Sequence, residues 1–320
     1  MDEFTSRSKE ILERSPFYQR LVSVVGANPQ TWETWRDVTP VSVTYFKSAP
    51  VVGSRFWESS GTSGNKSRTP VDLESYHQGI DQSWKVGPEI HPVSIALIPS
   101  RYDWPNSSLA EMFSYHIESR SEVLRGVEVL TSDGFFRLDQ KFIYQYLKRT
   151  DDPVTLYGTS YAFAQFFEWV EENRCDDVLV LPSGSNLIDT GGYKGRVTPL
   201  TRREFLEKCS RLLGLPEESC WNEYGMSEMS SHFWQRGEGF HVGLSSHLVG
   251  QTLDPISLQP SISGLLTFYD LYNSNFVGLV TQDVGSIQVD RDYTYLQVGG
   301  RVPLSAPKGC SLISEELMSS

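Results

Sequence analysis

The sequence lacks an excess of positive charge and has no long hydrophobic run. Among its 320 residues, 28 are Lys or Arg and 40 are Asp or Glu, which gives a net charge of −12. Sequence-independent binding of DNA or RNA requires clustered cations, so this acidic balance argues against that class of protein. The longest apolar stretches, such as Val93–Ile98, are too short to cross a bilayer. We therefore expect neither a nucleic-acid partner nor a membrane span.

Cysteine is scarce as well, because only four cysteines occur and no two of them form a C-x-x-C pair. This spacing gives no indication of a zinc knuckle or a thioredoxin-type redox site. The N-terminal segment begins with acidic residues and has no apolar stretch typical of a signal peptide. Since free thiols suit a reducing compartment, we expect a cytoplasmic protein. Hydrophobic residues make up 39% of the chain, which is enough for a folded core and excludes a disordered chain.

Strand-like and helix-like segments alternate through the first two thirds of the chain. A T-x-x-E capping box at Thr201 and Glu204 predicts a helix that ends near Gly214. The other expected helices cover Ser6–Ser23 with a break near Pro16, Leu138–Leu147 and Tyr161–Glu172, and the expected strands cover Pro92–Ile98, Val127–Leu130, Val154–Tyr157 and Val178–Leu181. From Ser263 onward the pattern is typical of an antiparallel meander. We predict one α/β domain over residues 1–320, with a helical segment at 1–50 and a β-rich end at 263–320.

A segment of small residues, SSGTSGNKS, spans Ser59–Ser67. Its glycines free the backbone to point N–H groups inward, and its hydroxyls add donors, which together suit a polyphosphate. Lys66 can add a positive charge. The spacing differs from a Walker A loop, which requires four residues between the glycines. A flexible surface loop is the alternative, and this segment alone supports both interpretations equally.

A second segment, NEYGMSEMSS, contains Glu223 and Glu228 on either side of a Tyr-Gly turn. A carboxylate beside a phosphate loop is a natural ligand for Mg²⁺, which combines one or two carboxylates with phosphate oxygens and water. The alternative is a turn that leads into a helix, with Ser227 and Glu228 as its N-terminal caps. Taken alone, the segment favours this alternative.

Two further segments could contact a nucleotide. In DTGGYKGR, which begins at Asp189, paired glycines allow close approach to a flat ligand, Tyr193 offers a stacking surface and Lys194 is cationic. Asp283 at a strand end could accept the hydroxyls of a ribose, with Arg301 one strand later. A glycine-rich hairpin and an exposed Asp in a turn are the respective alternatives.

The segment Gly158–Ala162, GTSYA, approximates the G-x-S-x-G nucleophile elbow of hydrolases between a strand and a helix. Asp189 and a later histidine (His232, His241 or His247) would complete a triad in hydrolase order. However, the last position is Ala162 instead of glycine. A helix start capped by Thr159 or Ser160 is the favoured interpretation.

Taken in order, these segments resemble the acyl-adenylate-forming enzymes, a superfamily of acyl-CoA synthetases, adenylation domains and luciferases. The order is SSGTSG, GTSYAFAQ, GGYKGR, NEYGMSE, TQDVG and GGR. More narrowly, EYGMSEMSSHFW, GGYKGR and RVPLSAPKGCSL resemble the acyl-protein synthetase (LuxE-type) family. The resemblance extends from about Ser59 to Leu312. It implies the large N-terminal-type domain of adenylate-forming enzymes, in which mixed sheets pack with helices and a β-rich portion follows.

The resemblance also implies site residues. ATP and Mg²⁺ are the expected cofactors, with Glu228 as the metal ligand, Asp283 at the ribose and Arg301 nearby. The nucleotide-binding residues that it implies are Ser59, Ser60, Gly61, Thr62, Ser63, Gly64 and Lys66 around the phosphates, Gly191, Gly192 and Tyr193 around the adenine, and Tyr224 and Gly225 before Glu228.

The chain departs from the superfamily pattern in three ways. The phosphate loop continues with Asn65-Lys66 instead of x-Pro-Lys, which displaces the lysine. The ribose motif has Gln282 where the superfamily usually has glycine. Only 19 residues follow Arg301, so we expect the usual small C-terminal domain and its catalytic lysine to be missing, with Lys194 as the substitute cation.

A cysteine near the C-terminus carries the acyl group in the resembled family, and Cys310 matches that position here. Lys308 could lower the pKa of this thiol by charge proximity. A buried, inert cysteine is the alternative. The two interpretations are equally supported by the sequence.

We therefore predict an acyl-adenylate-forming ligase of the acyl-protein synthetase or acyl-CoA synthetase type. It would activate a carboxylic acid, in our interpretation a fatty acid, and pass the acyl group to a thiol on an acceptor protein or carrier. Two alternatives are an acyl hydrolase that uses Ser160 and a non-catalytic protein that binds a nucleotide or an acyl group. The residues do not identify the acid or the final acceptor.

Overall fold

The structure is a computed structural model and describes residues 2–47, 55–59, 66–130, 136–173, 179–191 and 200–302. Within it the chain forms two compact units, which we describe separately. The first unit comprises Met1–Lys85, Met226–His232 and Val242–Ser320, and the second comprises Val86–Gly225 and Phe233–His241. The two units are compact regions of the chain and do not test the prediction of a single adenylate-forming domain over residues 1–320, which stays a prediction.

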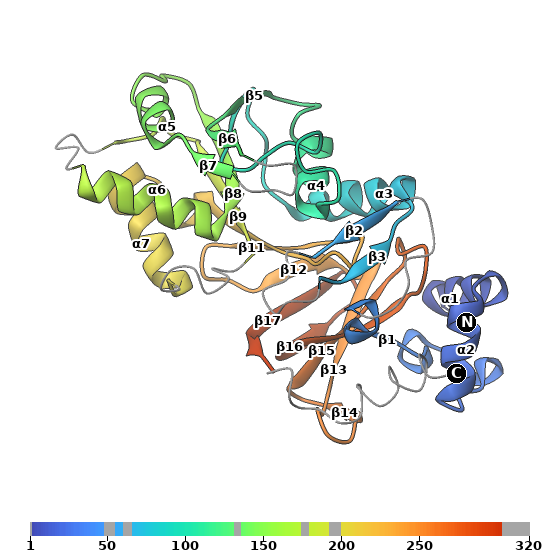
Figure 1. Ribbon diagram of the computed structural model, residues 1–320. Coiled ribbons are helices and arrows are strands. Elements are labelled where there is room, and N and C mark those ends of the chain that lie inside the picture. Colours follow the sequence, from blue (N-terminus) through green and yellow to red (C-terminus); the bar gives the residue numbers. More distant parts are fainter. Residues whose placement is uncertain are drawn as a thin grey trace. The chain divides into compact units, whose positions relative to one another are not determined.

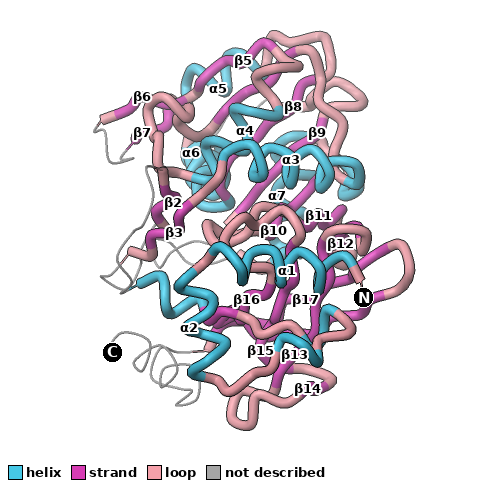
Figure 2. Tube along the Cα trace, turned by 90° about the vertical axis from the view of Figure 1, so that its right-hand side faces the viewer, coloured by secondary structure: helices cyan, strands magenta, loops and turns pink. Residues whose placement is uncertain are grey.

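The first unit contains an antiparallel sheet in which β13, β15, β16 and β17 run side by side (Figure 2). Its strand order is β14-β13-β15-β16-β17-β12, and β1 pairs in parallel with the start of β16. The helices of this unit are α1 (Glu3–Arg14), α2 (Pro16–Val24) and α3 (Leu73–Ser83), with 3₁₀ turns η1 (Pro29–Thr31), η2 (Trp35–Asp37), η3 (Val43–Lys47) and η4 (Trp84–Val86). Its strands are β1 (Val41–Ser42), β2 (Phe56–Glu58), β3 (Arg68–Pro70), β12 (His241–Leu244), β13 (Leu248–Leu253), β14 (Pro260–Ser261), β15 (Gly264–Asp270), β16 (Gly278–Val289) and β17 (Tyr293–Arg301).

The second unit contains a largely parallel sheet in the order β5-β4-β8-β9-β10-β11, in which β11 alone is antiparallel to its neighbour. Helices α6 and α7 lie next to this sheet (Figure 1). The helices are α4 (Ser108–His116), α5 (Gln140–Leu147), α6 (Ser160–Glu172) and α7 (Arg202–Leu213), with the turn η5 (Glu217–Ser219). The strands are β4 (Val93–Ala96), β5 (Glu122–Arg125), β6 (Val127–Val129), β7 (Phe136–Leu138), β8 (Val154–Thr159), β9 (Asn186–Thr190), β10 (Cys220–Tyr224) and β11 (Phe233–Arg236).

Most of the expected elements are confirmed with small shifts of their ends. The first helix is interrupted at Ser15, which caps α2 and precedes Pro16. The capping box of α7 forms as predicted, and Gly214 ends that helix with a φ of 66°. The phenylalanines of α6 are fully buried in the core that this helix shares with α5, α7 and the sheet. They are therefore core residues, in agreement with the helical spacing.

The predicted strand at Val178–Leu181 is wrong over its described part, residues 179–181. Leu179 and Leu181 are buried and Val180 is exposed, an alternation that imitates a strand. The backbone N–H of Leu181 instead donates to the carbonyl of Leu213 at the end of α7. The sheet continues through β9, a fully buried strand that begins at Asn186. A short apolar run cannot distinguish a strand from a segment that caps a helix end.

Candidate functional site

Strand β16 carries a bulge at the position of the predicted ribose motif. The register with β15 shifts between Leu265, which faces Val284, and Thr267, which faces Val280. Three residues of β16, Thr281, Gln282 and Asp283, therefore lie within the irregularity. Bulges re-aim side chains beside functional sites. This bulge contains Gln282 and Asp283, two adjacent residues with polar side chains.

Thr281 holds the bulge in place. Its hydroxyl donates to the carbonyl of Leu266 at 2.8 Å and accepts from the backbone N–H of Asp283 at 3.1 Å. The side chain is buried, so both bonds lie away from bulk solvent. The threonine of the motif thus stabilises the backbone that presents Asp283.

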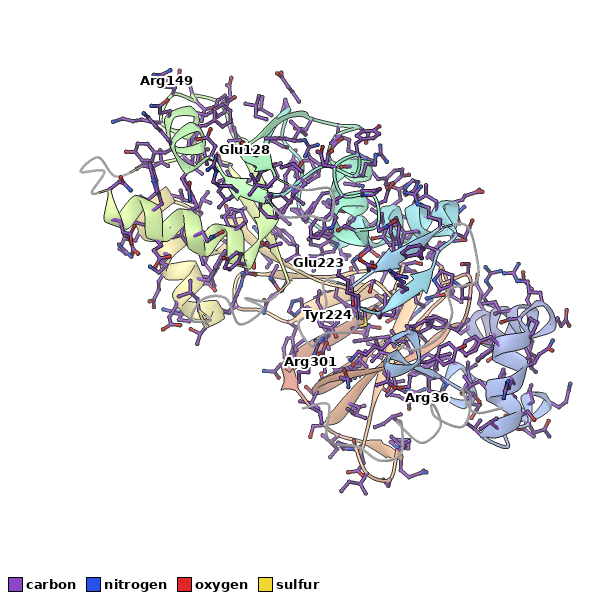
Figure 3. The ribbon with its side chains drawn as sticks, in the orientation of Figure 1. Arg36, Glu128, Arg149, Glu223, Tyr224 and Arg301 are labelled. Atoms are coloured by element: carbon purple, nitrogen blue, oxygen red, sulfur yellow. The ribbon has the colours of Figure 1, made fainter. Side chains whose placement is uncertain are left out.

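Asp283 and Arg301 form an ion pair across the antiparallel strands β16 and β17, in which they are direct partners. The guanidinium Nε donates to Asp283 Oδ1 at 2.7 Å. Asp283 is buried, whereas most of the Arg301 side chain is exposed at the end of β17 (Figure 3). The structure therefore brings together two residues that the sequence analysis placed at one sugar.

Glu228 is buried in the loop Met226–His232 of the same unit. Its two carboxylate oxygens accept hydrogen bonds from the hydroxyls of Ser67 at 2.7 Å and Ser227 at 2.9 Å. Burial raises the pKa of Glu228, while these two hydroxyls and the charge of Lys47 act in the opposite direction. No helix begins at Ser227 in the described residues, since a turn leads on to the strand β11, so the capping alternative is wrong.

A buried carboxylate fixes the loop that carries Glu228. Asp270, at the end of β15, accepts from the backbone N–H groups of Ser230 and Ser231 and from the Ser231 hydroxyl, each at 2.8 Å. Asn273 also donates to the carbonyl of Glu228 itself at 2.8 Å. These positioning residues were missed by sequence analysis, because nothing in a lone Asp or Asn indicates a partner 40 residues away.

The two ends of the predicted phosphate loop are joined. The Ser59 backbone N–H donates to the carbonyl of Ser67 at 3.0 Å, and the Ser59 hydroxyl accepts from the Ser67 N–H at 2.8 Å. Lys66 pairs with Glu58 at 2.7 Å on the β2–β3 hairpin, and Arg68 binds the same carboxylate. The bonds of Ser67 therefore link this loop to Glu228.

Several predicted residues fall outside the described part of the chain. These are Ser60, Gly61, Thr62, Ser63 and Gly64 in the phosphate loop, Gly192, Tyr193 and Lys194 in the GGYKGR segment, and Cys310. Their assignments stay predictions.

Lys47 is a site residue that the sequence analysis did not identify. Its ammonium donates to the side-chain oxygen of Gln282 at 3.0 Å. Burial lowers its pKa, the charge of Arg301 lowers it further and the charge of Glu228 raises it. Lys47 is thus electrostatically coupled to both Glu228 and Arg301. The sequence contained one indication of such a partner, namely Gln282, which stands where the resembled motif usually has glycine.

The second unit holds the other predicted nucleotide residues. Tyr224 ends β10 next to Glu223 (Figure 3), and Gly225 follows directly. The centroid of the Tyr224 ring lies 6.3 Å from the ring centroid of Phe233 and 5.8 Å from that of His241. Gly191 follows β9 with a φ of 71°, a conformation that favours glycine. Within this unit, Glu223 accepts a hydrogen bond from Thr190 on the neighbouring strand.

The arrangement around Ser160 does not form a hydrolase triad in the described residues. The Ser160 hydroxyl lies 2.8 Å from Asp189 Oδ2 and 2.7 Å from the Gly191 carbonyl oxygen, two acceptors for its single proton, and neither partner is a histidine. Asp189 in turn binds Arg202. A nucleophilic serine needs a base that accepts its proton, and the proton of this serine is taken up by a hydrogen bond to a carboxylate or a carbonyl oxygen.

No protein-family model matches the chain, and neither does any curated protein. Solved structures do match. The 2-hydroxyisobutyryl-CoA ligase in the postadenylation state with 2-HIB-AMP superposes with a TM-score of 0.64 at 15% identity, over 93% of this chain and 66% of the ligase. An open conformation of that ligase with 2-HIB-AMP and CoA gives 0.62 at 14% identity, over 93% and 73%.

A third structure, McyG A-PCP with phenylalanyl-adenylate, gives a TM-score of 0.53 at 14% identity, over 79% of this chain and 48% of that protein. This chain has the fold of adenylate-forming enzymes. The α/β fold-class prediction is therefore confirmed. The chain spans about two thirds of the length of the 2-hydroxyisobutyryl-CoA ligase in its postadenylation state. No described helix has the length and apolar character needed to traverse a lipid bilayer.

Proposed function

We propose that this protein uses ATP to convert a carboxylic acid into an acyl-adenylate. The observations that carry the proposal lie within one unit of an adenylate-forming fold: Lys47 binds Gln282 beside the Asp283–Arg301 ion pair, and Glu228 is tied to the end of the predicted phosphate loop through Ser67. Two carboxylates and two cations are the groups that a sugar, a metal-bound triphosphate and a developing phosphoryl charge require. Their order along the chain is also that of the resembled superfamily.

The proposed reaction has two steps. First, a carboxylate oxygen of the acid attacks the α-phosphorus of ATP, the bond to the β-phosphate oxygen breaks, and pyrophosphate leaves. Second, a thiolate attacks the acyl carbonyl carbon, the bond to the phosphate oxygen breaks, and AMP leaves, while the thiol proton passes to solvent. The first step needs no protein nucleophile, so the protein acts by positioning and by stabilising charge.

Asp283 is suited to accept the ribose hydroxyls, because the Thr281 bulge presents it and Arg301 holds it from one side. The phosphate loop, whose ends are tied at Ser59 and Ser67, would carry the triphosphate toward Glu228. The roles of Gly191, Tyr224 and Gly225 in nucleotide binding rest on the resemblance alone, as do those of the predicted residues outside the described chain.

The residues around Glu228 fit a Mg²⁺ ion bound together with phosphates. Among the described residues there is no group of three or more His, Cys, Asp or Glu side chains that could hold a metal alone. One carboxylate flanked by hydroxyls is instead the protein share typical of Mg²⁺ sites completed by substrate phosphates and water. When bound, the ion would neutralise phosphate charge.

The acid and the acceptor are finer parts of this proposal. We infer a fatty acid as substrate and a protein cysteine or carrier as acceptor, with Cys310 as a site of transient acylation. The resemblance to acyl-protein synthetases supports these assignments. Coenzyme A and carrier proteins occur with the structural neighbours and are the competing acceptors.

An acid-dependent ATP–pyrophosphate exchange screen tests the proposal. We expect exchange with at least one aliphatic or aromatic acid, and loss of exchange in Glu228→Gln and Asp283→Asn. Saturable ATP binding without exchange for any acid would instead support a nucleotide-binding protein. Ester cleavage without ATP that disappears in Ser160→Ala would support a hydrolase. For the second step, label from a radioactive acid should be lost from the protein in Cys310→Ser if that thiol carries the acyl group.

A further inference from the structure

The segment that ends in Lys47 lies along one edge of β16. Strand β1 pairs in parallel with Leu279 and Val280, while β15 occupies the opposite edge of β16 at these residues. Strand β17 takes over the first edge from Asp283 onward. Thr281 and Gln282 are therefore the two residues between these pairings, and Lys47, at the end of η3, binds the side chain of Gln282.

The Lys47 ammonium occupies a defined place in the site. It is half-buried, and its hydrogen bond to Gln282 fixes it next to the bulge that presents Asp283. Its charge interacts with those of Glu228 and Arg301. In ATP, the α-phosphate lies between the ribose and the metal-bound phosphates. Lys47 is held by Gln282 next to Asp283, the residue proposed for the ribose end, and its charge interacts with that of Glu228, the residue proposed for the metal-bound end.

Lys47 also differs from Lys66 and Arg301 in the kind of hydrogen-bond partner that the described residues provide. Lys66 forms an ion pair with Glu58, and Arg301 forms one with Asp283. Among the described residues, the hydrogen bond of Lys47 goes instead to a neutral amide oxygen. A neutral amide does not neutralise the ammonium, so its positive charge can still attract a bound anion.

We propose that Lys47 contacts the α-phosphate of ATP and stabilises the charge that develops there during adenylation, and that Gln282 positions it. This inference rests on the proposed function. It also explains why this chain has glutamine in the ribose motif, since a glycine there would offer no side chain to hold the ammonium. In this proposal Lys47, instead of Lys194, is the cation that substitutes for the catalytic lysine of the superfamily.

Calorimetric binding of ATP and of adenosine tests the contact without turnover. We expect Lys47→Met to weaken ATP binding by about fivefold to twentyfold and to leave adenosine binding unchanged, because only the phosphate contact is lost. Lys208→Met is the matched control, since Lys208 pairs with Glu171 on the surface of the second unit. It should leave both affinities unchanged. A urea titration of each variant confirms that it is folded.

Exchange kinetics test the catalytic part. At saturating ATP, Lys47→Met should lower the maximal exchange rate by about 10²–10³-fold, a larger effect than that on ATP affinity. Lys47→Arg should retain an intermediate rate because it keeps the charge. Gln282→Gly should lower the maximal rate by about threefold to tenfold in the parent protein and have no further effect in the Lys47→Met background.

Equal ATP affinities for the parent and for Lys47→Met would overturn the inference, as would a maximal exchange rate in Lys47→Met within threefold of the parent rate. If the parent binds ATP but catalyses no exchange, the proposed function fails. The affinities of the parent and of Lys47→Met for ATP and for adenosine then decide by themselves whether Lys47 contacts the phosphate. If the parent does not bind ATP, both proposals fall.

Discussion

Asp270 should be among the most important polar side chains for the stability of the first unit. It is buried, and it accepts hydrogen bonds from the N–H groups of Ser230, Ser231 and Tyr272 and from the Ser231 hydroxyl. Asp270→Ala would leave three backbone donors without an acceptor in a place with little access to water. Each such donor costs about 1–3 kcal/mol, and the costs are not fully additive. We expect a loss of about 4 kcal/mol in the free energy of unfolding.

Asp270→Asn should be milder, for a geometric reason. With its carbonyl oxygen at the Oδ2 position, asparagine still accepts from the N–H groups of Ser230 and Ser231. The asparagine NH₂ group then takes the Oδ1 position and faces the Ser231 hydroxyl and the Tyr272 N–H. The hydroxyl can rotate and accept a hydrogen bond from the NH₂ group, whereas the Tyr272 N–H is a donor and cannot accept one. With one donor in conflict, we expect a loss of about 2 kcal/mol.

Urea unfolding followed by tryptophan fluorescence measures both effects, since Trp32, Trp35 and Trp57 are buried in this unit. Asp254→Ala is the matched control. Asp254 also accepts from two backbone N–H groups and one hydroxyl, but in an exposed turn where water can replace it. Its urea midpoint should stay close to that of the parent. The reasoning is refuted if Asp270→Ala shifts the midpoint no more than Asp254→Ala, or if the alanine and asparagine variants of Asp270 are equally unstable.

Three further predictions concern packing, the bulge and pH. In Gly79→Ala the new Cβ would lie 2.4 Å from the carbonyl oxygen of Ser230, so we expect a loss of about 1–3 kcal/mol in urea unfolding and weaker pyrophosphate exchange. Thr281→Val should cost about 1–2 kcal/mol and weaken adenosine binding in calorimetry, because the hydroxyl that holds the Asp283 backbone is lost. Burial lowers the pKa of His241 from 6.5 to about 3 in the folded protein. As the pH drops below 6.5, the histidine therefore takes up a proton in the unfolded state but not in the folded state, and the free energy of unfolding falls. Between pH 7.5 and 4.5 the parent should lose about 3 kcal/mol more than His241→Gln, and equal losses would contradict a buried neutral histidine.

Local patterns were enough to predict many elements. The capping box at Thr201 and Glu204 and the glycine after it predict both ends of α7, because capping depends on residues three or four apart. The break before Pro16 follows in the same way from the missing N–H of proline. The antiparallel meander at the end of the chain is visible because each strand pairs with the next, across short turns.

The order of the motifs also placed Arg301 near Asp283 through the resemblance, but the ion pair between them became visible only in the structure. The same sequence could not distinguish Leu179–Leu181 from a strand. Its burial alternates like that of a strand, yet its backbone bonds to a helix end. Only the tertiary partner separates the two.

The chain's own amino-acid order therefore determined the short-range features: helix ends, strand alternation and the list of chemically capable residues. Folding decided which of those residues meet. Ser67 reaches Glu228 across 161 positions and Lys47 reaches Gln282 across 235, and both contacts depend on strand pairing and a bulge that no local pattern encodes. A hydrogen bond acts over about 3 Å of space whatever the separation along the chain, so the composition of the site became visible only in the folded protein.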